Sequence, residues 1–386
     1  MSTNNIKASN STDTTTTLDD NISRGIEKVT IDDNVDVSRY DDMSGTRLEE
    51  MNNKNCTSCD KKLEHTKTHE IISHNSASDK GDTTDVVSRD IPNSAEVSIC
   101  ANCGKAGAKN ICNKCKMVKY CNAACKKKHR SKHKKACERR VEELRDIELF
   151  KEPPLLHGDC PICFLRMPTL TMGFRYKQCC GKIICCGCIH AVEKADGGIG
   201  LCPFCRVPSP SSDKIIIEQL LKRVNAGDAL AIHTLGGMYN LGMYGFNQNY
   251  TKALELWHKA ADIGCAKSYH DAGVAYYNGK GVEKDEMKGE YYMELAAIRG
   301  NTEARHNLGS IEHNVGDMKR AIKHLLIAVG HGQNKALKNI QMFYSQGKVT
   351  KDEYAKALRA YQEYVKEIRS PQRDEAAAYG ELYKYY

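Results

Sequence analysis

Cysteine placement is the feature that most constrains what this chain can fold into. The 386-residue sequence holds 19 cysteines, and sixteen of them lie between Cys100 and Cys205. Most stand in pairs separated by two or three residues, a spacing with which two thiolates reach one metal ion. This density indicates that metal ions, rather than a large apolar core, organise this part of the chain.

The rest of the sequence favours metal sites over disulfides. The first residues, MSTNNIKASN, lack the apolar core of a signal peptide. No stretch approaches the roughly 18 apolar residues of a membrane span. The sequence therefore predicts a soluble, intracellular protein of the cytoplasm or nucleus, with no membrane partner. Disulfides are disfavoured in these compartments, whereas clustered CxxC pairs there more often bind metal.

Residues 1–95 are predicted to be a disordered tail. They are rich in Ser, Thr, Asn and Asp, as in STDTTTTLDDN, and show no sustained periodicity. Within them, Cys56, Cys59, His65 and His69 are side chains of the zinc-ligating kind. The gap from Cys59 to His65 is too short for a finger built from a hairpin and a helix, but it approaches the size of a knuckle loop. A metal site and a pair of free thiols both remain open here.

The first dense group supplies eight ligands, enough for two tetrahedral zinc ions. They are Cys100, Cys103, Cys112, Cys115, Cys121, Cys125, His133 and Cys137. The CxxxC and HxxxC pairs have helical i, i+4 spacing, which puts both members on one face. With Tyr120 before Cys121 and HKKAC at the end, residues 98–138 resemble a MYND zinc finger. The family interleaves its sites, which implies that Cys100, Cys103, Cys121 and Cys125 hold one Zn²⁺ and that Cys112, Cys115, His133 and Cys137 hold the other.

The resemblance to MYND fingers implies a protein-binding module. Such fingers usually bind short proline-containing peptides through a Gln after the sixth ligand and a Trp a few residues on. Lys126 and Arg130 stand at those places here, which departs from the peptide-binding pattern. The basic stretch CKKKHRSKHKKAC offers a weaker alternative, nucleic-acid binding, against a simple solvated helix face. It has no interleaved aromatic residues for stacking, so nucleic acid is not the expected partner.

The second dense group opens with CPIC and closes with CPFCR. Its ligand candidates are Cys160, Cys163, Cys179, Cys180, Cys185, Cys188, Cys202 and Cys205. Residues 157–208 thereby resemble a RING finger of the all-cysteine variety. In that family, ligand pairs one and three share a zinc ion, as do pairs two and four. The resemblance implies that Cys160, Cys163, Cys185 and Cys188 hold one Zn²⁺, and that Cys179, Cys180, Cys202 and Cys205 hold the other.

One departure concerns the third and fourth ligands of this group. Cys179 and Cys180 are adjacent, whereas the family has at least one residue between them. Neighbouring side chains diverge in extended backbone, so both reach one metal only if the chain turns there. The alternative is that one of them binds and another group, such as His190, completes the site. Cys186 is the ninth cysteine for eight places, and we expect it to be a bystander thiol.

RING modules of the ligase type bind a ubiquitin-conjugating enzyme. They use an apolar residue in the first zinc loop, a Pro in the last loop and often a basic residue after the final ligand. Ile162, Pro203 and Arg206 occupy these positions. The aromatic residue that often supplements this contact is missing from IHAVEKADGGIGL. The resemblance therefore leaves two functions open, a ubiquitin-protein ligase and a non-catalytic zinc-dependent scaffold.

The C-terminal half carries an internal repeat. Leu235-Gly236, Ala272-Gly273 and Leu308-Gly309 recur at spacings of 37 and 36 residues. A Gly follows the second helix of each predicted pair, as suits a helix C-terminus. The pattern resembles the Sel1-like repeat, a relative of the tetratricopeptide unit, and such arrays bind peptides or proteins on their concave face. About three clear repeats and one degenerate repeat fall within 211–368, followed by a C-terminal tail at 369–386. A helical connector at 139–156 joins the two cysteine-rich modules.

The sequence thus predicts a multidomain chain with a disordered N-terminal tail, two small zinc-stabilised modules and an all-α helical-repeat solenoid. It contains no nucleophile motif, phosphate-binding loop or methyl-donor signature, so we predict no catalytic residue. The expected function is that of a zinc-binding protein-interaction adaptor. In it the helical repeats and the MYND-like finger bind proteins, and a ubiquitin-conjugating enzyme is a candidate partner of the RING-like module.

Overall fold

A computed structural model of the chain describes residues 98–169, 171–197 and 200–386. The predicted N-terminal tail and its Cys56–His69 ligand set lie outside the described residues. The described chain divides into two compact units, and the division falls between Leu144 and Arg145. Each unit is described by itself. Within the described ranges, no helix combines the length and the apolar character that crossing a membrane requires.

The first unit is built around its own cysteines. Strands β1 (Asn110–Ile111) and β2 (Lys119–Tyr120) pair antiparallel and lead into helix α3 (Ala123–Leu149). Cys100, Cys112 and Cys115 are buried together with Ala108 and Tyr120, so ligand candidates fill most of this small core. Helix α3 is continuous over 27 residues. Residues 139–149 of the predicted connector are therefore the distal part of the same helix, and residues 150–156 are not helical.

The second cysteine module, residues 157–208, is a short hairpin followed by a helix. It contains η1 (Thr171–Gly173), β3 (Phe174–Lys177), β4 (Lys182–Cys185) and α4 (Cys186–Ala195), with β3 and β4 antiparallel. Four of its buried core residues are cysteines, and the other four are Met167, Phe174, Ile184 and Ile189. So few apolar side chains make a core that depends on what the cysteines hold.

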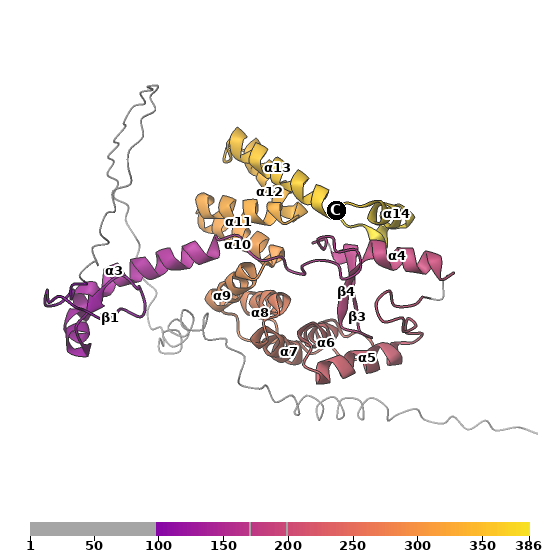
Figure 1. The fold of residues 1–386 in the computed structure, drawn as a ribbon, viewed down its shortest axis with the longest axis horizontal. Coiled ribbons are helices and arrows are strands. Elements are labelled where there is room, and N and C mark those ends of the chain that lie inside the picture. The colour runs from indigo at the N-terminus through magenta and orange to yellow at the C-terminus, as the bar shows by residue number, and fades with distance from the viewer. Residues whose placement is uncertain (1–97, 170, 198–199) are drawn as a thin grey trace, which may run out of the picture. The chain divides into compact units, whose positions relative to one another are not determined.

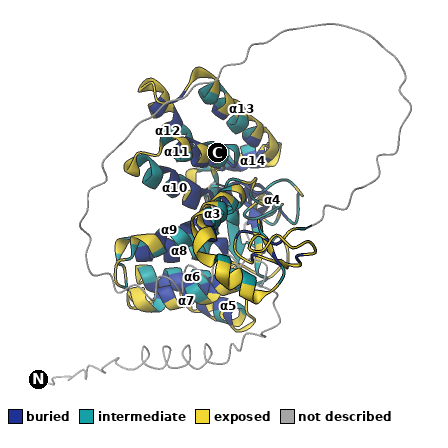
Figure 2. Ribbon diagram, turned by 90° about the vertical axis from the view of Figure 1, so that its left-hand side faces the viewer, coloured by how far each residue is buried: buried dark blue, intermediate teal, exposed yellow. Residues whose placement is uncertain are grey.

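The remaining helices form the predicted all-α solenoid, which the structure confirms (Figure 1). Successive antiparallel pairs stack on one another, and Figure 2 shows their buried faces meeting between the pairs. The helices are α5 (Asp213–Asn225), α6 (Ala229–Leu241), α7 (Tyr250–Asp262), α8 (Ala266–Asn278), α9 (Glu286–Ile298), α10 (Thr302–Val315), α11 (Met318–Gly330), α12 (Asn334–Ser345) and α13 (Lys351–Ile368). The glycines after α7, α9 and α11 have φ of 90°, 90° and 85°, as the C-terminal positions predicted.

A ladder of polar side chains joins the first helices of successive repeats. His233 Nε2 lies 2.9 Å from Asp271 Oδ2. One repeat further on, Asn307 lies 3.1 Å from His270, and in the next repeat Asn339 lies 3.2 Å from His306. These histidines recur at the same spacing as the Leu-Gly landmarks. The repeat in the sequence therefore encodes bonds between repeats as well as the core within each.

The C-terminal residues 369–386, predicted as a tail, are folded. They form α14 (Pro371–Tyr379) and the 3₁₀ turn η2 (Glu381–Tyr383), and α14 packs against α4 of the second cysteine module. We call residues 370–386 the C-terminal strap. Periodicity missed it because a nine-residue helix shows too few turns to reveal an apolar face.

The second cysteine module lies along the edge of the solenoid where one repeat passes into the next. Arg223, at the end of α5, donates to the carbonyl oxygen of Cys179 at 3.0 Å. Tyr176 donates to Asp228, the N-cap of α6, at 2.7 Å. Further along the edge, the Thr169 hydroxyl donates to the carbonyl oxygen of His331 at 2.5 Å. These contacts come from helix ends and from the loops between repeats. The polar ladder on the first helices of the repeats therefore does not hold the module.

Candidate metal centres

Four CxxC pairs adopt the same turn. In each turn the residue after the second cysteine donates its N–H to the carbonyl oxygen of the first cysteine, at 2.9 Å in all four. That residue has positive φ in every case, namely 71° at Gly104, 54° at Lys116, 57° at Phe164 and 61° at Arg206. Positive φ is uncommon for residues other than glycine. Positive φ recurs at the same position of all four turns. This shared conformation directs the two cysteine sulfurs of each turn toward one point.

Apart from Cys179 and Cys180, which lie in the turn between β3 and β4, the remaining ligand candidates lie at or near helix starts or on helix faces. Cys125 lies in the first turn of α3, and His133 and Cys137 follow further along that helix. Cys188 lies in the first turn of α4, directly after Cys185 at the N-cap.

The structure brings the sixteen candidates together in four clusters. Within each cluster the ligand atoms all lie within 4.8 Å of one another. The clusters are Cys100, Cys103, Cys121 and Cys125; Cys112, Cys115, His133 and Cys137; Cys160, Cys163, Cys185 and Cys188; and Cys179, Cys180, Cys202 and Cys205. We call them clusters 1 to 4 in this order. They group the residues as the two family resemblances imply, with neighbouring pairs interleaved.

The spacing of the sulfur atoms fits zinc. Zinc–sulfur bonds of about 2.3 Å in a tetrahedron place the sulfurs about 3.8 Å apart. In cluster 3, Cys160 lies 3.9 Å from Cys188 and Cys163 lies 3.8 Å from Cys185. In cluster 2, the Cys112–Cys137 distance is 3.8 Å. A disulfide requires about 2.05 Å between sulfurs, so these are not bonded pairs.

The adjacent Cys179 and Cys180 both reach cluster 4. Cys179 Sγ lies 3.4 Å from Cys205 Sγ, and Cys180 Sγ lies 3.9 Å from Cys202 Sγ. The hairpin between β3 and β4 turns at this point, because Gly181 N–H donates to the carbonyl oxygen of Lys177 at 2.8 Å. The turn removes the divergence expected of neighbouring residues in extended backbone.

His190 does not lie in any of the clusters. Its ring packs against Tyr379 and Tyr383 of the strap, with ring centroids 4.8 Å and 5.5 Å apart. Cys186 also lies outside them. Its thiol donates to the carbonyl oxygen of Met172 at 2.8 Å, and burial raises its pKa. A raised pKa disfavours the reactive thiolate, so the structure places Cys186 as a packing residue.

The close approach of four thiols within one cluster favours the binding of a cation. In cluster 3, hydrogen bonds from Cys163, Cys185 and Cys188 lower the pKa of Cys160. The bond to Cys160 in turn raises the pKa of Cys185 and of Cys188. Ionisation of Cys160 is therefore favoured and ionisation of Cys185 and Cys188 is opposed, since like charges so close repel each other. A divalent ion removes this conflict and lets all four sulfurs bind as thiolates.

The donor sets define what the centres can do. Each cluster offers four protein ligands, either four sulfurs or three sulfurs and one imidazole. Zinc sites with four protein ligands leave no position for substrate or water, and they stabilise structure rather than catalyse. Zn²⁺ in these clusters would cross-link a turn to a helix start in each module.

Exposed aromatic residues next to the ligands were not anticipated from the sequence. Phe164 follows the second ligand of cluster 3 and is 78% exposed, and Phe204 lies between two ligands of cluster 4 and is 47% exposed. Arg206 is exposed nearby, while Ile162 and Pro203 are half-buried. Large apolar side chains held at the tips of zinc turns have no role in the core, which is the signal that could have identified them.

Comparison with known families identifies two of the three folded regions. Residues 100–137 match the MYND finger family, and residues 235–265 and 266–301 match the Sel1 repeat family. Over 99 residues the chain is 30% identical to the ERAD-associated E3 ubiquitin-protein ligase component HRD3B of Arabidopsis thaliana. This match covers 25% of the chain and spans only 15% of that relative.

Solved structures with Sel1-type repeats resemble the helical half. A Sel1 repeat protein from Oxalobacter formigenes is 21% identical with a TM-score of 0.35, covering 43% of this chain and 69% of that one. A protective antigen of uropathogenic Escherichia coli with an SLR fold is 25% identical with a TM-score of 0.34, covering 42% of this chain and 35% of the other. The chain thus carries a MYND finger, a second cysteine-rich module and a Sel1-type helical-repeat solenoid.

Proposed function

We propose that this protein is a zinc-dependent interaction adaptor whose second cysteine module is a RING-type finger that recruits a ubiquitin-conjugating enzyme. In this proposal each cysteine module holds two Zn²⁺ ions, one in each of clusters 1 to 4. The MYND finger and the solenoid bind protein partners. The second module, held on the edge of the solenoid, brings the conjugating enzyme to what they bind.

The interleaving of clusters 3 and 4 is the observation that carries the proposal. Along the chain, ligand pairs one and three form cluster 3, and pairs two and four form cluster 4. A hairpin and a helix fill the space between the two clusters. This is the arrangement implied by the RING resemblance, and a chain of independent zinc turns would instead pair neighbouring ligands.

Surface chemistry on the second module supports recruitment of a protein partner. Phe164 and Phe204 extend from the first and last zinc turns, where they present apolar surface to solvent. Exposed aromatic residues on a rigid scaffold are typical anchors of protein interfaces. Arg206 follows the last ligand with its side chain exposed, where it can donate hydrogen bonds to a carbonyl oxygen of a bound partner. The partial similarity to HRD3B, which is described as an E3 ubiquitin-protein ligase component, also supports a role in ubiquitin transfer.

The test is autoubiquitination by the full-length, zinc-loaded protein with a panel of purified conjugating enzymes. We expect modified protein to form with at least one enzyme, and we expect Ile162→Ala, Phe164→Ala and Arg206→Ala each to reduce its rate about 10-fold or more, as for loss of an interface anchor. Met287→Ala on α9 and Arg359→Ala on α13 are matched controls, because both side chains are exposed on helices away from the zinc turns. No product with any enzyme of a broad panel would refute the ligase function.

A non-catalytic scaffold is the second candidate, favoured by one contact. Helix α4, the helix of the second module, is covered by α14 of the same chain, so this face of the module is already used internally. A scaffold predicts that partners captured by the full-length protein are retained by Arg206→Ala and lost on zinc chelation. A ligase predicts in addition that Arg206→Ala abolishes ubiquitin transfer while partner capture persists.

A further inference from the structure

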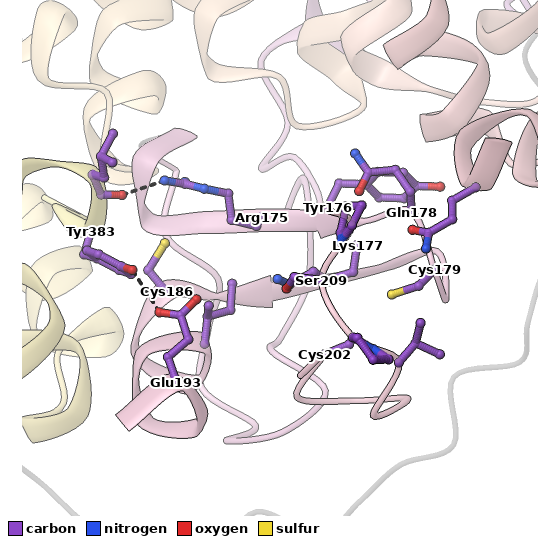
Figure 3. A pocket seen from close by; sticks show the side chains of 16 residues that line it. Arg175, Tyr176, Lys177, Gln178, Cys179, Cys186, Glu193, Cys202, Ser209 and Tyr383 are labelled. Atoms are coloured by element: carbon purple, nitrogen blue, oxygen red, sulfur yellow. Dashed lines mark hydrogen bonds between the residues drawn. The ribbon is translucent and has the colours of Figure 1, made fainter. Parts of the chain in front are cut away.

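The C-terminal strap crosses the second cysteine module directly over the helix that carries two ligands of cluster 3. Tyr383 donates to Glu193 of α4 at 2.9 Å, and Lys194 of α4 pairs with Glu375 of α14 at 2.5 Å. Figure 3 shows Tyr383 reaching toward Glu193 across the edge of a pocket of about 360 Å³, which the strap helps to close. The strap is therefore fixed to α4 along its length.

Gly187 allows the strap to approach α4 closely. It lies between the ligands Cys185 and Cys188 and has no side chain. A Cβ atom at this position would lie 2.8 Å from Cγ of Arg373, 3.0 Å from its backbone nitrogen and 3.1 Å from its Cα. Distances this short are not tolerated, so the glycine is what brings Arg373 against the turn that holds the ligands.

The guanidinium of Arg373 is buried against cluster 3. The residue is 2% exposed. Its side chain donates to the carbonyl oxygens of Arg166 at 2.8 Å and Ile368 at 2.6 Å. Its other terminal nitrogen lies 3.7 Å from Sγ of Cys163. Its Nε has no hydrogen-bond partner among the described residues.

A buried arginine needs a compensating negative charge. Carbonyl oxygens satisfy its N–H groups but carry no net charge. One Zn²⁺ bound by four thiolates leaves two negative charges uncompensated, and cluster 3 is such a site. The arginine and the zinc–thiolate group are thus each other's counter-ions. The N–H···S contact with Cys163 would place the guanidinium directly beside one of these sulfurs.

We propose that Arg373 of the C-terminal strap supports the metal ligands of cluster 3 through a hydrogen bond to a ligand sulfur, without binding the metal itself. Retention of metal in this cluster therefore depends on docking of the strap. The inference rests on zinc filling cluster 3 and not on ligase activity. Because coupling between two binding events is reciprocal, loss of this zinc also weakens docking of the strap on α4.

Chelation followed by thiol labelling tests the proposal. The full-length, zinc-loaded protein is challenged with excess chelator and pulsed with iodoacetamide, and labelling at each cysteine is followed by peptide mass spectrometry. In Arg373→Met we expect labelling of Cys160, Cys163, Cys185 and Cys188 to be about 10-fold faster or more, the usual effect of losing a hydrogen bond to a metal ligand. Arg373→Lys keeps the charge without the planar fork, so its rate should lie between those of the wild type and Arg373→Met.

Three comparisons make the result specific. The MYND cysteines serve as an internal reference, and their labelling should not change. Arg359→Met is the matched control, since Arg359 is an exposed arginine on α13, outside the strap. Gly187→Ala should reproduce the effect of Arg373→Met, because the added methyl group displaces the strap at Arg373 while the arginine itself is retained.

Two results would overturn this proposal alone and leave the zinc assignment intact. One is unchanged labelling of cluster 3 in both Arg373→Met and Gly187→Ala. The other is equal acceleration at clusters 3 and 4, which would assign Arg373 a general role in the stability of the module. Fast labelling of cluster 3 already in the wild type would show that this cluster holds no zinc, and would overturn the inference together with the zinc assignment while leaving the ligase assay to stand separately.

Discussion

Removal of zinc should unfold the second cysteine module and leave most of the solenoid folded. The apolar side chains in the core of this module are Met167, Phe174, Ile184 and Ile189. Burying each contributes about 1.5–3 kcal/mol, so together they supply about 6–12 kcal/mol. A structural zinc ion contributes about 10–16 kcal/mol in small finger peptides, and two ions are proposed here. The metal therefore outweighs the apolar core of the module.

The solenoid has no such dependence. Its larger core cluster joins buried side chains from α5 to α8, with Leu220, Leu235 and Trp257 among them, and its second cluster extends from α11 to α13. Cysteine contributes only Cys265 to these cores. Side chains of this size and number stabilise a helical array without metal.

Hydrogen exchange with mass spectrometry, before and after complete chelation, measures the difference. We expect the backbone amides of β4 and α4 to lose their protection, while those of α6 to α11 keep theirs. Amide protection at Ile184 that survived removal of all zinc would refute the reasoning, because the apolar residues alone would then hold the module. Loss of protection throughout α6 to α11 would refute it as well, by showing that the solenoid depends on the metal.

Three further predictions concern single residues. Cys185→Ser should lower the zinc content from four ions per chain to three by native mass spectrometry, whereas Cys186→Ser should retain four because that thiol only contacts a carbonyl oxygen. Gly300→Ala should lower the free energy of unfolding in urea by roughly 2–4 kcal/mol, since φ at this position is 90° and the added Cβ would lie 2.2 Å from a backbone oxygen. As a control, Gly347→Ala should lower it by only about 1 kcal/mol, because Gly347 has φ of 69° but open space around it. Burial, with smaller contributions from two nearby arginines, lowers the pKa of His324 well below its usual value, so the unfolded chain takes up the proton first. The contribution of His324 to stability should therefore fall as pH drops below about 6.5, by up to about 1.4 kcal/mol per pH unit. Burial also lowers the pKa values of His157, His258, His306 and His331, so His324→Leu should reduce the total slope between pH 7.5 and 5.5 without abolishing it; an unchanged slope would contradict the assignment.

The sequence identified the ligand pairs because each pair depends on local geometry, whereas the family resemblances implied how the pairs combine into clusters. A CxxC turn fixes two sulfurs within a few residues, and i, i+4 spacing fixes two ligands on one helix, as for His133 and Cys137. The solenoid was predictable for a similar reason. Its landmarks recur every 36 or 37 residues, and each repeat is a unit that packs mainly on its neighbours.

Adjacent Cys179 and Cys180 mark the limit of local reasoning. Whether both reach one metal depends on a turn of the backbone, and the sequence left His190 as an alternative. The hairpin between β3 and β4 supplies that turn, while contacts with the strap hold His190 elsewhere. A neighbouring hairpin and a distant helix thus decided what the spacing of the cysteines left open.

By itself, then, the sequence determined the local ligand pairs and the helical repeat, whose geometry is set within a few residues or within one repeat, and the family resemblances implied how the pairs combine. Only the tertiary structure decided where the second module docks and what surrounds its metal site. Arg373 lies 210 residues from Cys163 along the chain, and the two meet because the strap packs on α4. No local pattern encodes such a pair, since its distance depends on the packing of every element between the two residues.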